Sequence, residues 1–331
     1  MAVTIEDIKK LRAMTGAGLA DVKKALTEAE GDFDKAKDLL RERGLAIAAK
    51  RSDRETSNGC VLVKVAEGFG AMIALKCETD FVANGADFIA LTQCILDAAI
   101  ANKCKTIDEV KELTLADGQK VQDAVTQRSG ITGEKMELDG YLTLEGENIY
   151  TYNHQNKNML CTMVQMNKDA EEQGHVLAMQ VAAMNPVALD EASVPQEVKD
   201  NELQVAIQKT REEQIEKAVE SALKKAGINP NLVDSDDHVE SNIAKGWLTR
   251  EEADRAAVVR KEATEQKAAN MPEQMIQNIA QGRLNKFFKE NCLINQEFIQ
   301  AENKETVADY LKAADKDLAV VAFKRFTLRA E

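Results

Sequence analysis

The sequence predicts an α+β protein with a small helical head, a core of antiparallel strands and helices, and a long helical arm. Apolar residues recur at helical spacing through the first 50 residues and again between about 195 and 290, whereas they alternate with period two in two regions between residues 60 and 166. Hairpin strands followed by helices favour an α+β fold over a parallel, doubly wound sheet.

Length and charge exclude several classes of protein. A chain of 331 residues is long enough for two or three domains with buried cores. Its formal charge of -13 repels phosphate polymers, so we expect no nucleic-acid partner. No apolar run approaches the roughly 20 residues that cross a bilayer, so we expect no membrane-spanning helix. The first residues resemble no targeting segment, and we expect a cytoplasmic location.

The head is predicted at residues 1–51 as three short helices. Thr4 is an N-cap with Asp7 at the third helical position, and the first helix should stop at Gly16. A third helix should begin after Asp32 and end at Gly44. The head has 11 basic and 9 acidic side chains. Its small positive charge favours contact with an acidic surface, although a solvated helical surface without a partner is an equally weighted alternative.

Two core subdomains follow a polar linker at residues 52–58. The first, at 59–132, should contain strands 60–65 and 71–77 joined by a turn at Gly68-Phe69-Gly70, and then a helix from about Ala86 to Asn102. The second, at 133–194, should group three further strands and a closing helix. These four elements are expected at 135–144, 148–153, 159–166 and 173–184.

A helical arm is predicted at residues 195–290, followed by a C-terminal module at 291–331. Thr249 and Glu252 form a capping box inside the arm, and Trp247 should pack under that turn rather than anchor a partner. The C-terminal module should contain a strand-like segment near 292–299, a helix capped at Thr306, and a strand at 318–326. That last strand should rejoin an earlier sheet, which makes the arm an excursion from a folded body.

Catalytic and nucleotide-binding motifs are missing from the sequence. The phrase from Gly44 to Ser52 lacks the second glycine of a phosphate-binding loop, and Gly16-Ala17-Gly18 joins two helices rather than a strand and a helix. Six cysteines form no Cys-x-x-Cys pair, and His154, His175 and His238 have no metal-ligand spacing. We therefore expect free thiols, structural or interface histidines, no metal and no cofactor.

Several ordered segments resemble the elongation factor Ts family and together cover nearly the whole chain. The chain departs from the family between about residues 202 and 250, where its arm is larger than the usual helical hairpin. The matching segments are residues 10–26 (KLRAMTGAGLADVKKAL), 77–84 (CETDFVAN), 174–176 (GHV), 182–186 (AAMNP) and 282–288 (GRLNKFF).

The resemblance implies a translation elongation factor that acts as guanine nucleotide exchange factor for elongation factor Tu. It implies a head similar to ubiquitin-associated domains, two related core halves, a coiled-coil-like hairpin and a C-terminal module. It also implies binding to the GTPase itself, without direct nucleotide binding or covalent chemistry. The family's finger, which disturbs the Mg²⁺ site of the GTPase, maps onto Thr79, Asp80, Phe81 and Val82. Further partner contacts map onto Arg12, Lys23, His154 and Ile299.

The position of the finger gives this mapping a physical basis. A short loop between a predicted strand and a predicted helix can present Phe81 to a partner, and burying such a ring is worth about 1.5–3 kcal/mol. The structural alternative places Phe81 in the core beside Phe88. A competing function is a non-catalytic adaptor that uses the head and the arm, with the arm a candidate for self-association. An enzyme using His154 or a cysteine is the least favoured class.

Overall fold

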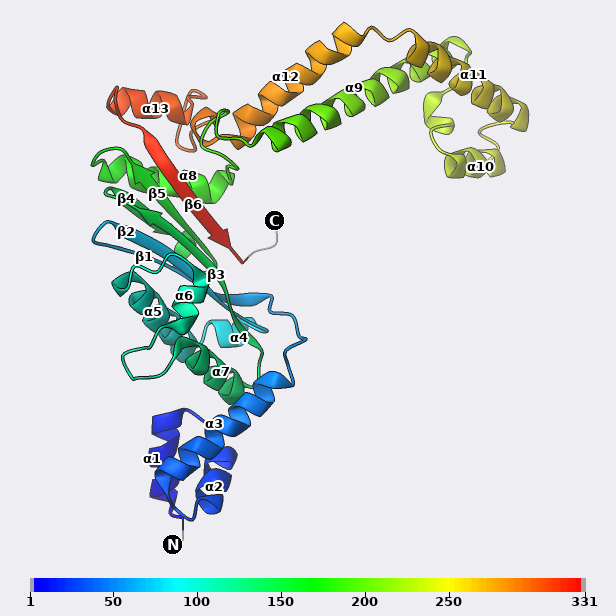
Figure 1. The fold of residues 1–331 in the computed structure, drawn as a ribbon. Helices are drawn as coiled ribbons and strands as arrows, with labels where there is room; N and C mark the ends of the chain where they lie inside the picture. The colour runs from blue at the N-terminus through cyan, green and yellow to red at the C-terminus, as the bar shows by residue number, and fades with distance from the viewer. Residues whose placement is uncertain (1–2, 329–331) are drawn as a thin grey trace. The chain divides into compact units, whose positions relative to one another are not determined.

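The computed structural model describes residues 3–328, which fall into two compact units. The first unit combines the chain up to Asn185 with the chain from Phe298 onward, and the second is Pro186–Glu297. Figure 1 traces this path by colour from blue to red. The chain thus leaves one folded body as a helical arm and returns to it, as predicted. Residues 1–2 and 329–331, at the ends of the predicted head and C-terminal module, lie outside the described residues.

The head contains the three predicted helices. The backbone N–H of Asp7 donates to the Thr4 hydroxyl at 3.1 Å, and the Asp7 carboxylate accepts from the Thr4 N–H at 3.0 Å, so the predicted capping box is present. Gly16 ends the first helix with a φ of 69°, a conformation that glycine adopts without a Cβ penalty. The head helices are α1 (Ile5–Thr15), α2 (Leu19–Glu28) and α3 (Phe33–Ala49).

The prediction that the third helix ends at Gly44 is wrong, because α3 continues to Ala49. Gly44 lies where α3 crosses α7 (Val121–Thr132), and the glycine facing it is Gly130. A Cβ atom added to Gly130 would lie 2.2 Å from the Cα atom of Gly44. Gly44 therefore serves a close helix crossing rather than a helix end.

The first sheet has the order β1-β2-β3 and is antiparallel throughout. Strands β1 (Asn58–Ala66) and β2 (Phe69–Cys77) are joined by Glu67 and Gly68, whose φ angles of 50° and 70° suit a two-residue hairpin turn. The predicted Gly68-Phe69-Gly70 turn is thus one position too late, and Phe69 is a buried strand residue.

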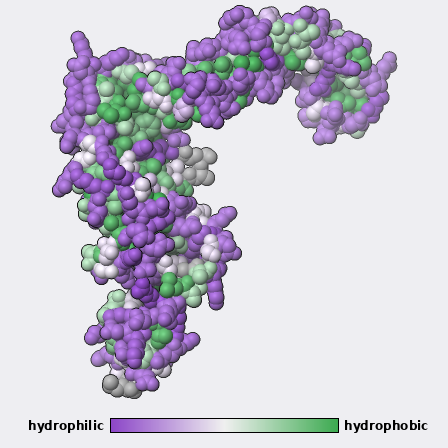
Figure 2. Space-filling model, viewed as in Figure 1, coloured by the Kyte–Doolittle hydropathy of each residue, from purple (hydrophilic) through white to green (hydrophobic). Residues whose placement is uncertain are grey.

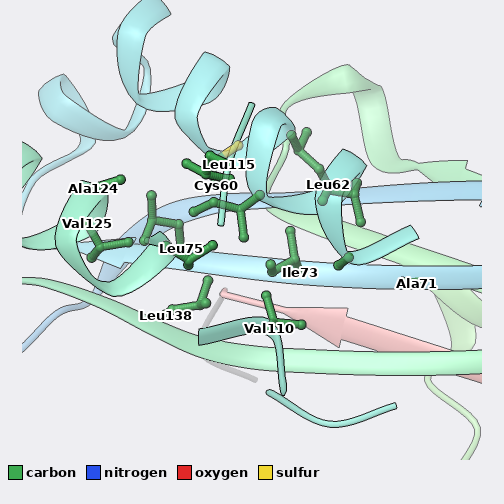
Figure 3. Close-up of a cluster of buried hydrophobic side chains, with 14 of the residues drawn as sticks. Cys60, Leu62, Ala71, Ile73, Leu75, Val110, Leu115, Ala124, Val125 and Leu138 are labelled. Atoms are coloured by element: carbon green, nitrogen blue, oxygen red, sulfur yellow. The ribbon is translucent and has the colours of Figure 1, made fainter. Parts of the chain in front are cut away.

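The third strand, β3 (Met136–Glu145), pairs with β2 and belongs to this first sheet. The prediction that residues 135–144 belong to the second core subdomain, with the two later strands, is therefore wrong. The physical reason is the core that β3 completes: Leu138 lies opposite Leu75 and packs in the same apolar cluster. Figure 3 shows this cluster between the sheet and its helices. The covering helices are α5 (Ala86–Ala101), α6 (Ile107–Glu112) and α7.

A second antiparallel sheet has the order β4-β5-β6 and packs on the first. Strand β2 is buried on both faces: Ile73 joins the cluster under the helices, whereas Met72 joins a cluster with Cys161 and Met163 of the second sheet. Helix α8 covers the outer face, where the Thr162 hydroxyl donates to the Ala178 carbonyl at 2.7 Å. These elements are β4 (Ile149–Asn153), β5 (Leu160–Met166), α8 (Glu171–Met184) and β6 (Val320–Thr327).

The pairing of β6 with β5 confirms that the last strand rejoins an earlier sheet. Helix α13 (Val307–Ala314) begins at the predicted Thr306 cap, which forms a capping box with Asp309. The strand-like segment predicted near 292–299 is wrong. Cys292 makes only an isolated bridge to Ala188, and a 3-10 turn, η3 (Leu293–Asn295), buries the apolar run instead.

The arm is helical, and its helices are interrupted at glycine and proline positions, near Gly227 to Pro230 and at Pro272. Its long helix α9 (Gln196–Lys225) packs against α12 (Glu273–Asn291) and α11 (Arg250–Ala269). Figure 2 shows hydrophobic residues as a band along part of the arm, between hydrophilic surfaces. The short elements between α9 and α11 are η2 (Pro230–Leu232) and α10 (Asp236–Ala244).

The capping box of Thr249 and Glu252 at the start of α11 is confirmed, but the expected packing of Trp247 is wrong. The Trp247 side chain is 65% exposed, and the Lys245 ammonium lies 5.1 Å from its ring centroid. Leu248 fills the apolar space under the turn instead, in the cluster formed by the residues between α9 and α11.

Free thiols are also observed. All six cysteines are free, and Cys94 is the exposed one. Among residues 3–328, no group of three or more His, Cys, Asp or Glu side chains could hold a metal ion. Within the same residues, every helix is too short or too polar to cross a membrane.

We predict that the two glycines of the helix crossing respond differently to alanine. Gly130→Ala should destabilise the protein by about 1–3 kcal/mol, as overpacked sites do, because the new Cβ would collide with the α3 backbone. Gly44→Ala is the matched control, since its Cβ would lie 3.6 Å from the Gly130 Cα atom, an ordinary contact. Urea unfolding should separate the two variants. Equal stabilities would show that the helices do not cross at these residues.

Candidate functional site

The strongest candidate site is a single helical turn at residues 79–82, which we call the finger. Strand β2 ends at the buried Cys77, and helix α4 (Asp80–Ala83) follows with Thr79 as its N-cap. The Thr79 hydroxyl accepts a hydrogen bond from the Val82 N–H at 3.3 Å. The Asn84 side-chain amide donates to the Asp80 carbonyl at 2.8 Å and closes the turn. Local capping therefore explains why this segment forms one defined turn between a strand and a helix.

Helix α4 has one side packed against the protein core and one side exposed to solvent. Ala83 is buried, and Val82 packs against the core cluster of the first sheet. Phe81 is 87% exposed, although a buried phenylalanine is the usual case. Phe88, three residues into the next helix, is fully buried. The structure therefore rules out Phe81 as a core residue beside Phe88 and confirms its expected exposure.

Two carboxylates tie the base of the finger to the segment that leads into β3. The Glu78 carboxylate accepts from the Lys135 N–H at 2.6 Å and from the Arg54 guanidinium at 3.0 Å. The Glu134 carboxylate accepts from the Thr79 N–H at 3.1 Å and from the Thr79 hydroxyl at 2.6 Å. Residues 78–79 and 134–135 thus hold each other reciprocally through hydrogen bonds to charged groups, which are the stronger kind.

The electrostatics of this base follow from those contacts. The Lys135 N–H, supported by the Arg54 guanidinium, holds the pKa of Glu78 below its ordinary value of 4.5. Burial, with Glu134 as a second cause, raises the pKa of the Cys77 thiol to about 12. The Cys77 thiol donates to the Thr79 carbonyl at 3.2 Å, and it stays protonated at neutral pH. Cys77 is therefore a structural donor and not a nucleophile.

A surface hollow lies beside the exposed ring. Arg128 of α7 also lines it and pairs with Asp87 at 3.0 Å. An exposed ring, a neighbouring carboxylate and a hollow make a surface suited to engage a protein partner. The hollow is lined by Asp80, Phe81, Val82, Asn84, Gly85, Arg128 and Thr132.

The other expected contact residues lie on separate elements. Arg12 of α1 and Lys23 of α2 are exposed in the head, and neither side chain has an ion pair within residues 3–328. His154 is half-buried, and its Nδ1 atom lies 3.2 Å from the Tyr152 hydroxyl. Ile299 is 38% exposed, and its N–H donates to the Gln180 side chain at 2.8 Å. In the described part of the chain, no hydrogen bond, ion pair or ring contact joins these four residues to the finger.

Sequence reasoning missed Glu78 and Glu134 as the residues that hold the finger. The Lys135 N–H and the Glu78 carboxylate are 57 positions apart in the chain. Only the pairing of β2 with β3, which sets Cys77 opposite Met136, brings them together. The sequence holds no local signal for that register.

Comparisons with known proteins agree with the motifs. A family model described as Elongation factor TS matches residues 78–226 and 209–330. The chain is 65% identical over 332 residues to Elongation factor Ts of Bacteroides fragilis and 62% identical over 331 residues to that of Phocaeicola vulgatus. It is 42% identical over 332 residues to that of Porphyromonas gingivalis. Each of these three comparisons covers 100% of both chains.

We predict that the Glu78 contact weakens only in acid. A carboxyl group whose pKa is lowered in the folded state contributes stability above its unfolded pKa, and that contribution is lost as the pH falls through the folded value. Hydrogen exchange at the Lys135 amide, corrected for intrinsic pH dependence, should therefore keep constant protection from neutral pH to about pH 5 and lose it below the ordinary Glu78 value of 4.5. In Glu78→Gln this loss should be missing. Loss of protection already between pH 7 and pH 5 would contradict the lowered pKa.

Proposed function

Because the chain belongs to the elongation factor Ts family, we propose that it binds elongation factor Tu in its GDP form and promotes GDP release, which allows GTP to bind. The observation that carries this proposal is the 87% exposure of Phe81 on a turn whose base is fixed. In the proposal the finger, Thr79 to Val82, enters the partner near its Mg²⁺ and phosphate site.

Phe81 and Asp80 have different roles in the proposed exchange. Phe81 gains about 1.5–3 kcal/mol when its ring leaves water, and that gain is available only in a partner. Asp80 brings a carboxylate on the same turn, which competes for the groups that order the partner's Mg²⁺. Mg²⁺ tolerates little departure from octahedral oxygen coordination. A small displacement of the groups around the ion therefore weakens the binding of Mg²⁺ and of the nucleotide phosphates that it coordinates.

One phenylalanine cannot drive exchange alone. Converting a partner from 99% nucleotide-bound to 99% nucleotide-free takes about 5.5 kcal/mol of differential affinity. Further contacts must supply the remainder, and the proposal assigns them to Arg12, Lys23, His154 and Ile299. Linkage then requires that nucleotide rebinding displaces the factor to the same extent. The proposed activity has no covalent step and places no nucleotide, metal or cofactor on this chain.

The direct test is GDP release from purified elongation factor Tu. Catalytic amounts of this protein should accelerate the loss of a fluorescent GDP analogue in the presence of excess GTP. An adaptor that binds elongation factor Tu without promoting exchange would leave the release rate unchanged, and that result would refute the proposal.

We predict that Phe81→Ala lowers the rate of GDP release by about tenfold or more, since losing at least 1.4 kcal/mol of differential binding has that effect. The fold of this protein should not change, because the ring is exposed. Stopped-flow release and thermal melting would measure both effects. Val258→Ala on α11 is the matched control, since it also truncates an exposed apolar side chain, 56% accessible. Equal release rates for the two variants would remove Phe81 from the mechanism.

We predict that Arg12→Ala slows association with elongation factor Tu mainly at low salt. The Arg12 side chain is exposed, and salt at about 0.15 M screens charges over roughly 8 Å. Association rates should be compared at 0.05 M and 0.3 M salt with Lys217→Ala, which removes an exposed charge from α9. A salt-independent loss in Arg12→Ala would indicate packing in place of charge attraction.

A further inference from the structure

Glu134 holds the finger without belonging to it. It follows Gly133, which ends α7 with a φ of 74°, and its own carbonyl accepts the Ser129 hydroxyl at 2.6 Å. Its backbone N–H donates to the Thr132 hydroxyl oxygen at 3.3 Å. The Glu134 side chain therefore starts from a fixed backbone at the end of a packed helix, and it reaches across to Thr79.

The two hydrogen bonds from Thr79 to Glu134 set the direction of the Thr79 hydroxyl. A threonine hydroxyl has one proton and two lone pairs. Because the proton points to the Glu134 carboxylate at 2.6 Å, a lone pair is free to face the Val82 N–H at 3.3 Å. The second carboxylate oxygen takes the Thr79 N–H at 3.1 Å. Glu134 thus fixes both the backbone and the cap of the turn that carries Phe81.

The contact between Glu78 and Lys135 anchors the neighbouring position but cannot replace this function. It holds the peptide before the finger to the start of β3. It does not contact Thr79, whose hydroxyl caps α4. Without Glu134, the finger would keep its attachment to the sheet and lose the orientation of its first residue.

We propose that Glu134 is a positioning residue for nucleotide exchange: it preorders residues 79–82 so that Phe81 and Asp80 meet the partner already in place. This inference rests on the proposed function. Ordering a loop during binding consumes free energy that is otherwise available for the interaction, so a preordered finger leaves more to drive release. Functional side chains are positioned more precisely when neighbouring residues hold them through hydrogen bonds.

The test compares Glu134→Ala with Glu109→Ala. Glu109 is the matched control because its carboxylate also accepts two hydrogen bonds in a helix cap of the same unit. Its donors are the backbone N–H groups of Lys105 at 2.6 Å and Thr106 at 3.3 Å. At saturating factor, GDP release from elongation factor Tu should be about tenfold slower with Glu134→Ala. Affinity for nucleotide-free elongation factor Tu should change less than the release rate. Glu109→Ala should match the wild type in both.

A double variant separates positioning from general stability. If Glu134 acts through the finger, Glu134→Ala should slow GDP release much less in the Phe81→Ala background than in the wild type, because only the placement of Asp80 is then left to lose. Multiplied effects would mean that Glu134 acts elsewhere and would overturn the inference. Hydrogen exchange at the Val82 amide should rise in isolated Glu134→Ala and stay unchanged in Glu109→Ala, a readout that needs no partner.

The outcomes distinguish this inference from the proposed function. A wild-type protein that does not accelerate GDP release would defeat the proposed function. Normal release by Glu134→Ala, alongside impaired release by Phe81→Ala, would defeat only the positioning role. Should Glu134→Ala fail to fold, Glu134→Gln serves instead: its single acceptor oxygen should give an intermediate rate, and a wild-type rate with wild-type Val82 exchange would overturn the inference.

Discussion

The antiparallel pairing of β2 with β3 is the contact on which the candidate site depends. It sets Cys77 opposite Met136, and the residues just beyond each strand end, 78–79 and 134–135, then lie within hydrogen-bonding distance. The same pairing buries Leu138 beside Leu75 and completes the core under the helices. Apolar burial therefore provides the register, and the register places the charged groups that hold the finger. The hydrogen bonds at the base of the finger therefore depend on the pairing of strands that are far apart in the chain.

The parts of the fold that were predictable are those with local causes. Thr4, Thr249 and Thr306 each cap a helix with an acidic residue three positions later, and all three capping boxes are present. The sequence alone left two alternatives for Phe81, exposure on a short loop or burial beside Phe88, and the structure exposes the ring.

The parts that were not predictable depend on what approaches from elsewhere. Gly16 and Gly44 look alike in the sequence, yet one ends a helix and the other accommodates Gly130 of a distant helix. Trp247 and Leu248 are adjacent apolar residues, and only the shape of the cluster between α9 and α11 decides that Leu248 is the buried one. Glu134 carried no signal, because its role exists only once two strands have paired.

The protonated thiol beneath the finger has a consequence for oxidative stress. Peroxides attack thiolates far faster than thiols, and Cys77, with a pKa of about 12, offers almost no thiolate at neutral pH. Cys60 and Cys161 are protected in the same way. Oxidants therefore reach Cys94 on the surface first, and the buried thiol beneath the finger is spared.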